Sequence, residues 1–203
     1  ESTGLIKKMT LATLQRALKD LSVWLRVLPE CYLSINLSAK DFENPLLFSC
    51  ISSLISEYKI APKHLVFEIT ETALMHDSVK ALECMKQLKS LGCKIYLDDF
   101  GTGYSSLTYL KKFPIDILKI DHSFVKDIGI DANDEAIIHS TLALAHSLGK
   151  ECVAEGVETF EQVQFLEMLG CSYLQGFLFS KPVPSKDVVA LLSQDWGKEF
   201  GGE

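Results

Sequence analysis

The sequence predicts an α/β fold built on a parallel sheet, and three observations support this prediction. Short aliphatic segments alternate with longer segments of helical periodicity, a pattern typical of parallel strands joined by helical crossovers. The chain has 203 residues, 47% of them hydrophobic, which suits a single domain with a large core. Polar residues recur where the predicted strands end. Both an open doubly wound sheet and a closed barrel are compatible with this alternation.

Six segments are predicted as strands because each is short, rich in aliphatic or aromatic residues and bounded by turn or cap residues. A closed barrel of this type has eight strands, so it needs two more than these segments supply. The predicted strands are Tyr32–Leu37, Leu65–Thr70, Lys94–Asp98, Ile115–Ile120, Glu151–Ala154 and Tyr173–Phe177.

Helices are predicted between the strands, where capping residues and glycines mark their ends. Asn44 and Pro45 are expected to be the N-cap and first residue of a helix that runs to about Tyr58. Other helices are expected over about residues 5–27, 77–91, 134–148 and 159–169, and from near Ser185. Their signals are the N-cap Asp77, a capping box from Thr159 to Gln162, the apolar face Val79, Leu82, Met85 and Leu88, and stops at Gly92, Gly149 and Gly170.

Charge and cysteine usage narrow the classes of partner. The chain has 20 Lys and Arg residues against 27 Asp and Glu residues, a formal net charge of −7. DNA, RNA and anionic membranes usually bind a basic face, so none is expected as a partner. The six cysteines form no Cys-x-x-Cys pair and are expected to be reduced thiols of a cytoplasmic protein. No run of about 18 apolar residues occurs, so no membrane contact by this segment is expected, which leaves open an anchor in a longer parent protein.

The most informative pattern is a polar residue at or near the end of each predicted strand. The polar residues of successive predicted strands are separated by 32, 30, 21, 36 and 20 residues, about one strand–helix unit each. In parallel α/β folds the carboxyl ends of the strands meet at one edge, where active sites are built. Carboxylates gathered there need cations among them, and hard oxygen ligands suit Mg²⁺, Mn²⁺ or Ca²⁺ better than zinc. The residues are Asn36, Glu68, Asp98, Asp99, Lys119, Glu155 and Gln175.

Each of these residues also has a purely structural interpretation. Asn36 could simply end a strand, the Asp98–Asp99 pair could cap a turn, and Lys119 could pair with a carboxylate. The recurrence over successive strands favours a shared site. Asp99-Phe100-Gly101 matches a kinase triplet, but the sequence lacks the other kinase motifs, and the histidines show no metal-ligand spacing.

Six longer segments around these residues carry distinctive motifs: Ser34–Ala39 (SINLSA), Phe67–Thr72 (FEITET), Leu97–Leu107 (LDDFGTGYSSL), Ile117–Val125 (ILKIDHSFV), Ala154–Thr159 (AEGVET) and Leu174–Pro182 (LQGFLFSKP). In these segments, in family order and over nearly the whole chain, the sequence resembles the EAL domain family. The fold that this resemblance implies is a modified eight-stranded TIM-type α/β barrel.

The resemblance implies a phosphodiesterase that hydrolyses cyclic di-GMP to linear pGpG with two divalent cations, Mg²⁺ or Mn²⁺, and that Ca²⁺ inhibits. It assigns metal binding to Asn36, Glu68, Asp98 and Asp99. Lys119, Glu155 and Gln175 are expected to orient or activate the attacking water, and Glu71 to tether the loop from Phe100 to Ser106. Asp121, Glu158 and Pro182 are expected to contact a guanine or its ribose. A homodimer is expected from the family's habit.

One departure from the family pattern concerns the N-terminal end. The sequence contains no Glu-Ala-Leu motif, whose glutamate is a metal ligand in the family. We therefore expect residues 1–203 to be an incomplete EAL domain that lacks about two strands and has little activity by itself. A non-catalytic receptor for cyclic di-GMP, or a protein-interaction module, is the alternative interpretation.

Overall fold

The computed structural model describes residues 2–103 and 107–194, with side chains described over 9–103 and 110–194. Six strands lie in the sheet order β1-β2-β3-β4-β5-β6, which is also their order along the chain. Their bounds are β1 Leu33–Leu37, β2 Leu65–Thr70, β3 Lys94–Phe100, β4 Ile117–Ile120, β5 Glu151–Glu155 and β6 Tyr173–Gln175. The α/β class is confirmed, and every predicted strand end lies within two residues of the observed one.

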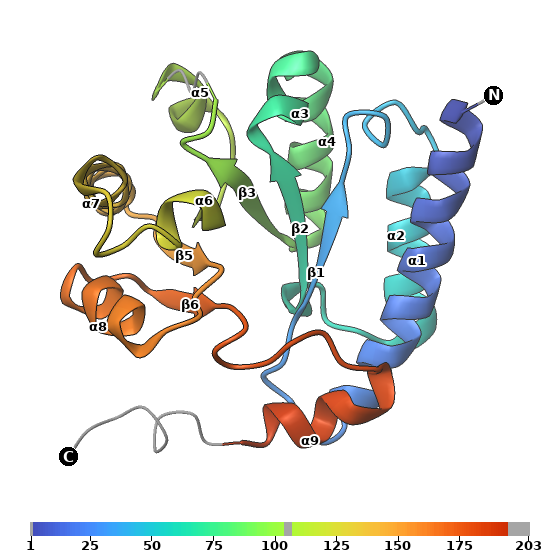
Figure 1. Ribbon diagram of the computed structural model, residues 1–203. Coiled ribbons are helices and arrows are strands. Elements are labelled where there is room, and N and C mark those ends of the chain that lie inside the picture. Colours follow the sequence, from blue (N-terminus) through green and yellow to red (C-terminus); the bar gives the residue numbers. More distant parts are fainter. Residues whose placement is uncertain (1, 104–106, 195–203) are drawn as a thin grey trace. The chain divides into compact units, whose positions relative to one another are not determined.

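The first of two compact units comprises Glu1–Leu97 and Ser106–Asp116. In it β1 and β2 are parallel, and Asn36 is the register partner of Glu68. The long helix α1 packs along α2, and α2 packs on α4 (Figure 1). The helices are α1 Ser2–Trp24, α2 Leu47–Tyr58, the short 3₁₀ turn η1 Pro62–His64, α3 Glu71–His76, α4 Ser78–Leu91 and α5 Leu107–Lys112.

The apolar positions of α1 and α2 account for this packing. Leu14, Leu18 and Leu21 recur at helical spacing on α1, and all three are fully buried. Ile51 and Leu54 are the buried face of α2. Helices with one apolar stripe gain most of their stability by burying it against a neighbour, so this core holds α1 in place.

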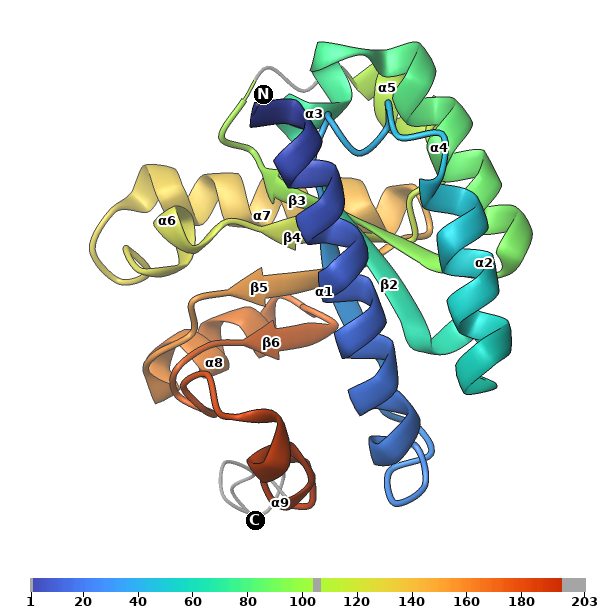
Figure 2. The same cartoon turned by 90° about the vertical axis from the view of Figure 1, so that its right-hand side faces the viewer.

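The second unit comprises Asp98–Ser105 and Ile117–Glu203. Here β4, β5 and β6 form parallel pairs, and Glu155 is the register partner of Gln175. The helix α7 packs against β4 and β5, and Figure 2 shows β5 and β6 side by side. All four residues of β4 are buried, as expected for a strand covered on both faces. The helices are α6 His122–Val125, α7 Ala132–Ser147, α8 Phe160–Met168, η2 Ser185–Asp187 and α9 Val188–Leu192.

Several predicted helix ends are confirmed. The Asp77 carboxylate accepts a hydrogen bond from the Lys80 N–H at 3.1 Å, and α4 ends at Gly92 with φ 97°. Thr159 and Gln162 form the predicted capping box at the start of α8. These predictions are confirmed because helix caps depend on residues three or four positions apart and not on distant packing.

Two local predictions were wrong. Asn44 is not the N-cap of α2, which begins at Leu47 after Leu46. The Asn44 Oδ1 instead accepts a hydrogen bond from the Leu46 N–H at 3.1 Å, so the side chain closes a local turn before the helix. Val79 was expected on the buried face of α4, but it is 66% exposed; the buried residues of that helix are Ala81, Cys84, Met85 and Leu88.

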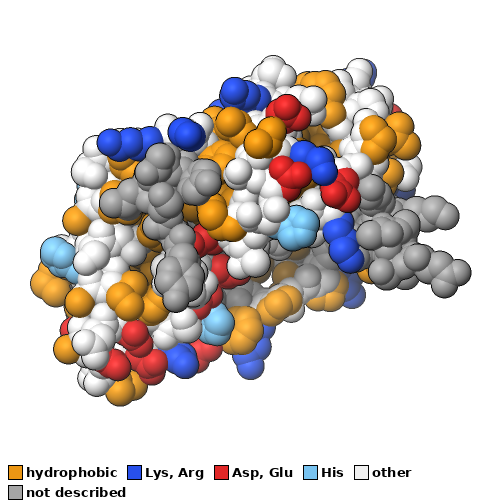
Figure 3. Space-filling model, turned by 90° about the horizontal axis from the view of Figure 1, so that it is seen from above, with side chains coloured by type: hydrophobic (Ala, Val, Ile, Leu, Met, Phe, Trp, Pro, Cys, Tyr) orange, Lys and Arg blue, Asp and Glu red, His pale blue; other side chains and the backbone are white. Residues whose placement is uncertain are grey.

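None of the helices that the structure describes has the length and hydropathy needed to cross a bilayer. The face drawn in Figure 3 is chemically mixed, with hydrophobic side chains beside both basic and acidic ones. All six cysteines are free thiols.

The segment after β6 passes very close to the segment after β5. The Val157 N–H donates to the Gln175 carbonyl at 3.0 Å, and the Leu178 N–H donates to the Val157 carbonyl at 3.0 Å. A Cβ atom at Gly176 would overlap the backbone nitrogen and carbonyl of Val157. Glycine at 176 is therefore required by backbone contact, and this contact places Gln175 beside the end of β5.

Replacing Gly176 with alanine is expected to lower the free energy of unfolding by about 3 kcal/mol, because backbone atoms must move to make room. Urea unfolding measures this loss. Gly149→Ala is the matched control: its Cβ would meet nothing within 4 Å, and its φ of 64° limits the cost to about 1 kcal/mol of left-handed strain. Equal losses in the two variants would contradict the overlap at residue 176.

Candidate metal-binding site

Three carboxylates meet within the second unit. Ligand oxygens of Asp98, Asp99 and Glu155 all lie within 4.8 Å of one another. The two aspartates end β3 and the glutamate ends β5, so the strand ends themselves bring the groups together. The side chains of Asp98 and Glu155 are only 13% and 18% exposed. Partly buried carboxylates this close repel one another strongly unless positive charge lies among them.

The ammonium group of Lys119 supplies such a charge. Its Nζ lies 3.0 Å from Asp98 Oδ1 and 2.7 Å from Glu155 Oε1, and the lysine side chain is 3% exposed. Lys119 lies on β4, where its neighbours in sequence, Leu118 and Ile120, are fully buried. Burying an ammonium is costly without partners, so the two ion pairs are what allow a lysine at this position.

Burial and neighbouring carboxylates raise the pKa of two carboxyl groups in the cluster. Burial raises the pKa of Glu155 to about 7, with a further contribution from the Asp98 carboxylate, while the Lys119 ammonium opposes the shift. Burial also raises the pKa of Asp99, and the nearby Asp98 and Asp121 carboxylates add to this increase. The negative charge of the cluster therefore exceeds what Lys119 neutralises.

The backbone at Asp99 is unusual. Its φ is 55°, in the left-handed region that residues other than glycine rarely adopt. The Asp99 N–H donates to Asp98 Oδ1 at 3.1 Å, and the Asp99 carbonyl accepts from the Thr102 hydroxyl at 2.8 Å. Left-handed residues of this kind concentrate at functional sites, where surrounding contacts hold them.

The donor set fits a hard divalent cation. Three carboxylates on adjoining strand ends supply only oxygen ligands, which Mg²⁺, Mn²⁺ and Ca²⁺ prefer. Burial, together with neighbouring carboxylates, raises the pKa of Asp99 and Glu155, and a divalent ion would favour the charged form of both. Asp98, Asp99 and Glu155 are therefore the residues of this unit that could hold such an ion.

Asp121 belongs to the surroundings of this cluster. It is 8% exposed and caps α6, where its Oδ1 accepts from the Ser123 N–H at 2.9 Å. Burial disfavours its charge, but the hydrogen bonds from Ser123 and the contact with His122 outweigh this and lower the pKa of Asp121. The family resemblance implies a guanine or ribose contact for Asp121. In the structure the Asp121 carboxylate also contributes to the raised pKa of Asp99.

The remaining predicted residues of the second unit have exposed side chains. Gln175 ends β6 in register with Glu155, so the two lie at the same edge. Glu158 and Pro182 are also exposed. The Glu158 N–H donates to the Gln162 side chain at 2.7 Å, which ties the residue to the capping box of α8.

Three predicted residues lie in the first unit. Asn36 and Glu68 are register partners at the ends of β1 and β2; Asn36 is exposed and Glu68 is 7% exposed. Glu71 begins α3 and is 3% exposed, and neither carboxylate oxygen has a hydrogen-bond partner among the described residues. A buried glutamate of this kind requires a partner to be stable. Residues 104–106 of the loop that Glu71 was predicted to tether lie outside the described residues.

His122 is a residue that the sequence did not single out. Its Nδ1 lies 3.2 Å from Asp121 Oδ2, and its side chain is 70% exposed. A Cβ added at Gly156 would lie 2.6 Å from the His122 Cβ, so the glycine after Glu155 allows the histidine to approach. In the sequence, only the position of His122 directly after Asp121 could have indicated its place beside the cluster, and such adjacency is a weak signal.

Replacing Lys119 with methionine is expected to lower the free energy of unfolding by about 3 kcal/mol without divalent ions, since two partly buried carboxylates lose their cation. The matched control is Lys89→Met, which removes a 2.7 Å ion pair with Asp116 between side chains that are 34% and 31% exposed. That pair should contribute about 1 kcal/mol or less. Urea unfolding in chelator measures both, and an equally small loss for Lys119→Met would contradict its role.

Comparison with known proteins is consistent with this geometry. The family model described as "EAL domain" matches residues 1–182. The bifunctional diguanylate cyclase/cyclic di-GMP phosphodiesterase MucR of Pseudomonas aeruginosa is 39% identical over 191 residues, covering 94% of this chain and 28% of MucR. The chain spans 22% to 28% of the length of the first three curated relatives.

Two solved structures have the same fold at substantial identity. The PaMucR phosphodiesterase in complex with c-di-GMP has a TM-score of 0.88 and 39% identity, covering 93% of this chain and 76% of that one. Klebsiella pneumoniae BlrP1 with manganese and cy-diGMP has a TM-score of 0.81 and 32% identity, covering 88% and 45%. Since the family model matches most of the sequence and the strand-end carboxylates are in place, the chain belongs to the EAL domain family.

Proposed function

We propose that the protein hydrolyses cyclic di-GMP to linear pGpG with two divalent cations, Mg²⁺ or Mn²⁺. The observation that carries this proposal is the partly buried cluster of Asp98, Asp99 and Glu155 with the Lys119 ammonium among them. The printed names of relatives support it: MucR is named for this phosphodiesterase activity, and the BlrP1 structure contains manganese and the cyclic dinucleotide.

We assign the metal ligands to the ends of successive strands. Asp98, Asp99 and Glu155 are the ligands that we assign in the second unit. The resemblance to EAL domains also assigns Asn36 and Glu68, which are register partners in the first unit. Divalent ions bound by these oxygens would neutralise phosphate charge and lower the pKa of the attacking water. Ca²⁺ takes longer bonds and looser geometry, so it is expected to occupy the ligands and inhibit turnover.

The chain's own catalytic groups follow from their contacts. Lys119 can give up its contact with one carboxylate and stabilise negative charge on the phosphate. Glu155 ends β5 beside Asp98 and Lys119, and its carboxylate could accept a proton from the attacking water. Gln175 lies in register with Glu155 and can orient the same water through its amide. For Glu71 we propose the role that the family resemblance implies, which is to hold the loop after β3.

Substrate contacts are assigned to residues around the cluster. The Asp121 carboxylate and the exposed side chains of Glu158 and Pro182 would receive a guanine or its ribose. Acidic side chains accept hydrogen bonds from guanine N–H groups, and proline offers an apolar face to a base. We further propose a homodimer in the cytoplasm; the six free thiols support a reducing compartment.

The test is incubation with cyclic di-GMP in Mg²⁺ or Mn²⁺, followed by chromatography of the products. It is made on residues 1–203 and on any longer gene product that contains them. Metal-dependent pGpG is the expected product. Saturable binding of cyclic di-GMP without pGpG from either sample would favour the receptor function instead. If neither sample binds or hydrolyses cyclic di-GMP, both functions are refuted.

Asp98→Asn is expected to reduce turnover at least about a hundredfold, because it removes charge from a metal ligand and from the Lys119 pair. The control is Glu167→Gln, an exposed glutamate on α8 with the same loss of one charge, which should leave turnover unchanged. Undiminished turnover in Asp98→Asn would remove this residue from the site.

Mg²⁺ or Mn²⁺ is expected to raise the melting temperature of the wild-type protein, because an ion that binds only the folded state stabilises it. Chelator should reverse the increase. The increase should be absent in Asp98→Asn and preserved in Glu167→Gln. Scanning calorimetry measures it without reference to activity, and an equal increase in all three proteins would indicate binding elsewhere.

A further inference from the structure

The side chain of Gln162 joins two segments of the second unit that are far apart in the sequence. Its Oε1 accepts hydrogen bonds from the Glu158 N–H at 2.7 Å and from the Thr159 N–H at 3.0 Å. Its Nε2 donates to the Val125 carbonyl at 3.1 Å, across 37 positions of sequence, and we call this contact the Gln162 bridge. Only one orientation of the amide makes all three contacts, because N–H groups need an acceptor and a carbonyl needs a donor.

The two joined segments carry residues that we have proposed as substrate contacts. Glu158 bonds to Gln162 through its backbone and leaves its own side chain exposed. Val125 is the last residue of α6, and Asp121 is the N-cap of the same four-residue helix. A contact that holds Val125 therefore also holds Asp121, one helical turn away, relative to the loop between β5 and α8.

The Gln162 bridge is protected from water. Gln162 is 6% exposed, and Val125 is fully buried. A buried carbonyl that loses its donor costs more free energy than an exposed one, because water does not replace the hydrogen bond. The Val125 carbonyl also accepts from the Ile128 N–H at the longer distance of 3.3 Å. Among the described residues, it would keep only this local contact without the Gln162 donor.

The capping box of α8 does not by itself require a glutamine at position 162. The Gln162 N–H donates to Thr159 Oγ1 at 3.3 Å, and the Gln162 side chain completes the box. Glutamate serves equally at this position of a capping box, and its negative charge suits the N-terminal end of a helix. A carboxylate, however, has no N–H group for the Val125 carbonyl. The bridge to α6 is therefore a property of glutamine that the cap does not explain.

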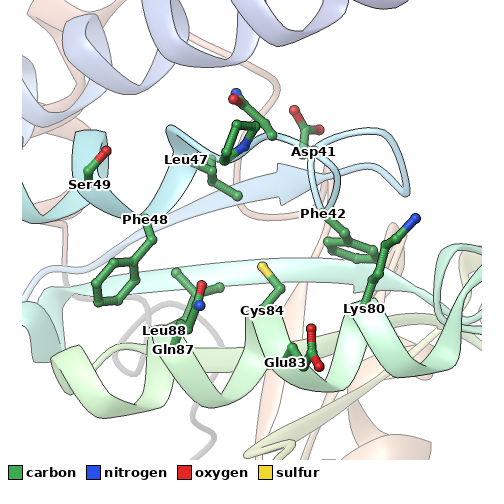
Figure 4. Close-up of a pocket in the computed structure, with 12 residues that line it drawn as sticks. Asp41, Phe42, Leu47, Phe48, Ser49, Lys80, Glu83, Cys84, Gln87 and Leu88 are labelled. Atoms are coloured by element: carbon green, nitrogen blue, oxygen red, sulfur yellow. The ribbon is translucent and has the colours of Figure 1, made fainter.

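The buried side chain of Asp41 in the first unit offers a contrast. It is 2% exposed and lies at a cavity of about 390 Å³ between α2 and α4. Its Oδ2 accepts from Ser38, three residues away, and Figure 4 shows the carboxylate directed away from the space between the two helices. That contact fixes one turn, whereas the Gln162 amide joins a loop to a distant helix.

We propose that Gln162 is a positioning residue for the substrate: its bridge to Val125 holds Asp121 and Glu158 where both contact the same guanine nucleotide. This role rests on the proposed phosphodiesterase function. The three carboxylates of the metal-binding cluster end strands instead, where sheet register and the Lys119 ion pairs place them. Loss of the bridge should therefore weaken substrate binding and leave the chemical step nearly unchanged.

The test compares Gln162→Glu with Gln164→Glu, the same change at an exposed glutamine of α8. KM and kcat for cyclic di-GMP are measured in residues 1–203 or in a longer gene product, whichever forms pGpG. Gln162→Glu is expected to raise KM about tenfold, the effect of one buried hydrogen bond, and to change kcat less than about twofold. Gln164→Glu should match the wild type. A cap alone would accept glutamate, so a wild-type KM in Gln162→Glu would overturn the proposal.

Thr159→Ala separates the cap from the bridge, since it removes the hydroxyl that accepts from the Gln162 N–H and leaves the Val125 contact in place. This variant should have a lower melting temperature and an unchanged KM. If Gln162→Glu does not fold, Gln162→Met takes its place, because methionine has a similar length and no charge. A KM in Thr159→Ala that rises as much as in the Gln162 variant would refute the bridge as the cause.

Hydrogen exchange tests the bridge without substrate. Backbone amides of residues 124–128 should exchange about tenfold faster in Gln162→Glu and at the wild-type rate in Thr159→Ala. Wild-type exchange in Gln162→Glu, or faster exchange with an unchanged KM, would overturn the role of Gln162 alone. Absence of pGpG from every wild-type sample would instead overturn the proposed function and, with it, the substrate role of Gln162.

Discussion

The candidate site depends on one lysine held among carboxylates. Lys119 Nζ lies within 3.0 Å of both Asp98 and Glu155, and its side chain is almost wholly buried on β4, a strand whose four residues are all buried. The Lys119 ammonium and the two carboxylates stabilise one another, because burying the ammonium alone, or the crowded carboxylates alone, costs several kcal/mol. The strand ends β3, β4 and β5 are therefore constrained by charge as well as by backbone hydrogen bonds.

The same constraint connects structure with chemistry. One ammonium cannot balance the four carboxylates Asp98, Asp99, Asp121 and Glu155. Burial raises the pKa of Asp99 and Glu155, and neighbouring carboxylates add to both increases. A site that is short of positive charge in a protein of net charge −7 is suited to divalent ions and, through them, to a phosphate diester. The acidic composition and a phosphate ligand are thus compatible.

At Asp41 and Asn44, the segment between β1 and α2 is held by local hydrogen bonds instead of ion pairs. There Asp41 Oδ2 accepts hydrogen bonds from the N–H and the hydroxyl of Ser38, and Asn44 Oδ1 accepts one from the Leu46 N–H. Both turns are local, and each leaves one polar atom facing away from its own backbone partner. Each motif therefore orients its side chain through one polar atom and leaves the other polar atom, Asp41 Oδ1 or Asn44 Nδ2, buried without a partner among the described residues.

The sequence by itself determined the strands, most helix ends and the identity of the polar residues at the strand ends, because periodicity and capping act over a few neighbouring residues. It could not decide that Asn44 closes a turn instead of capping α2, since an asparagine before a helix serves either purpose. Nor could it show that Lys119 contacts both Asp98 and Glu155, or that Asp121 approaches Asp99, because those contacts join residues that are 21 to 36 positions apart or lie on different strands. Distances across a sheet depend on register and packing, which only the tertiary structure decides.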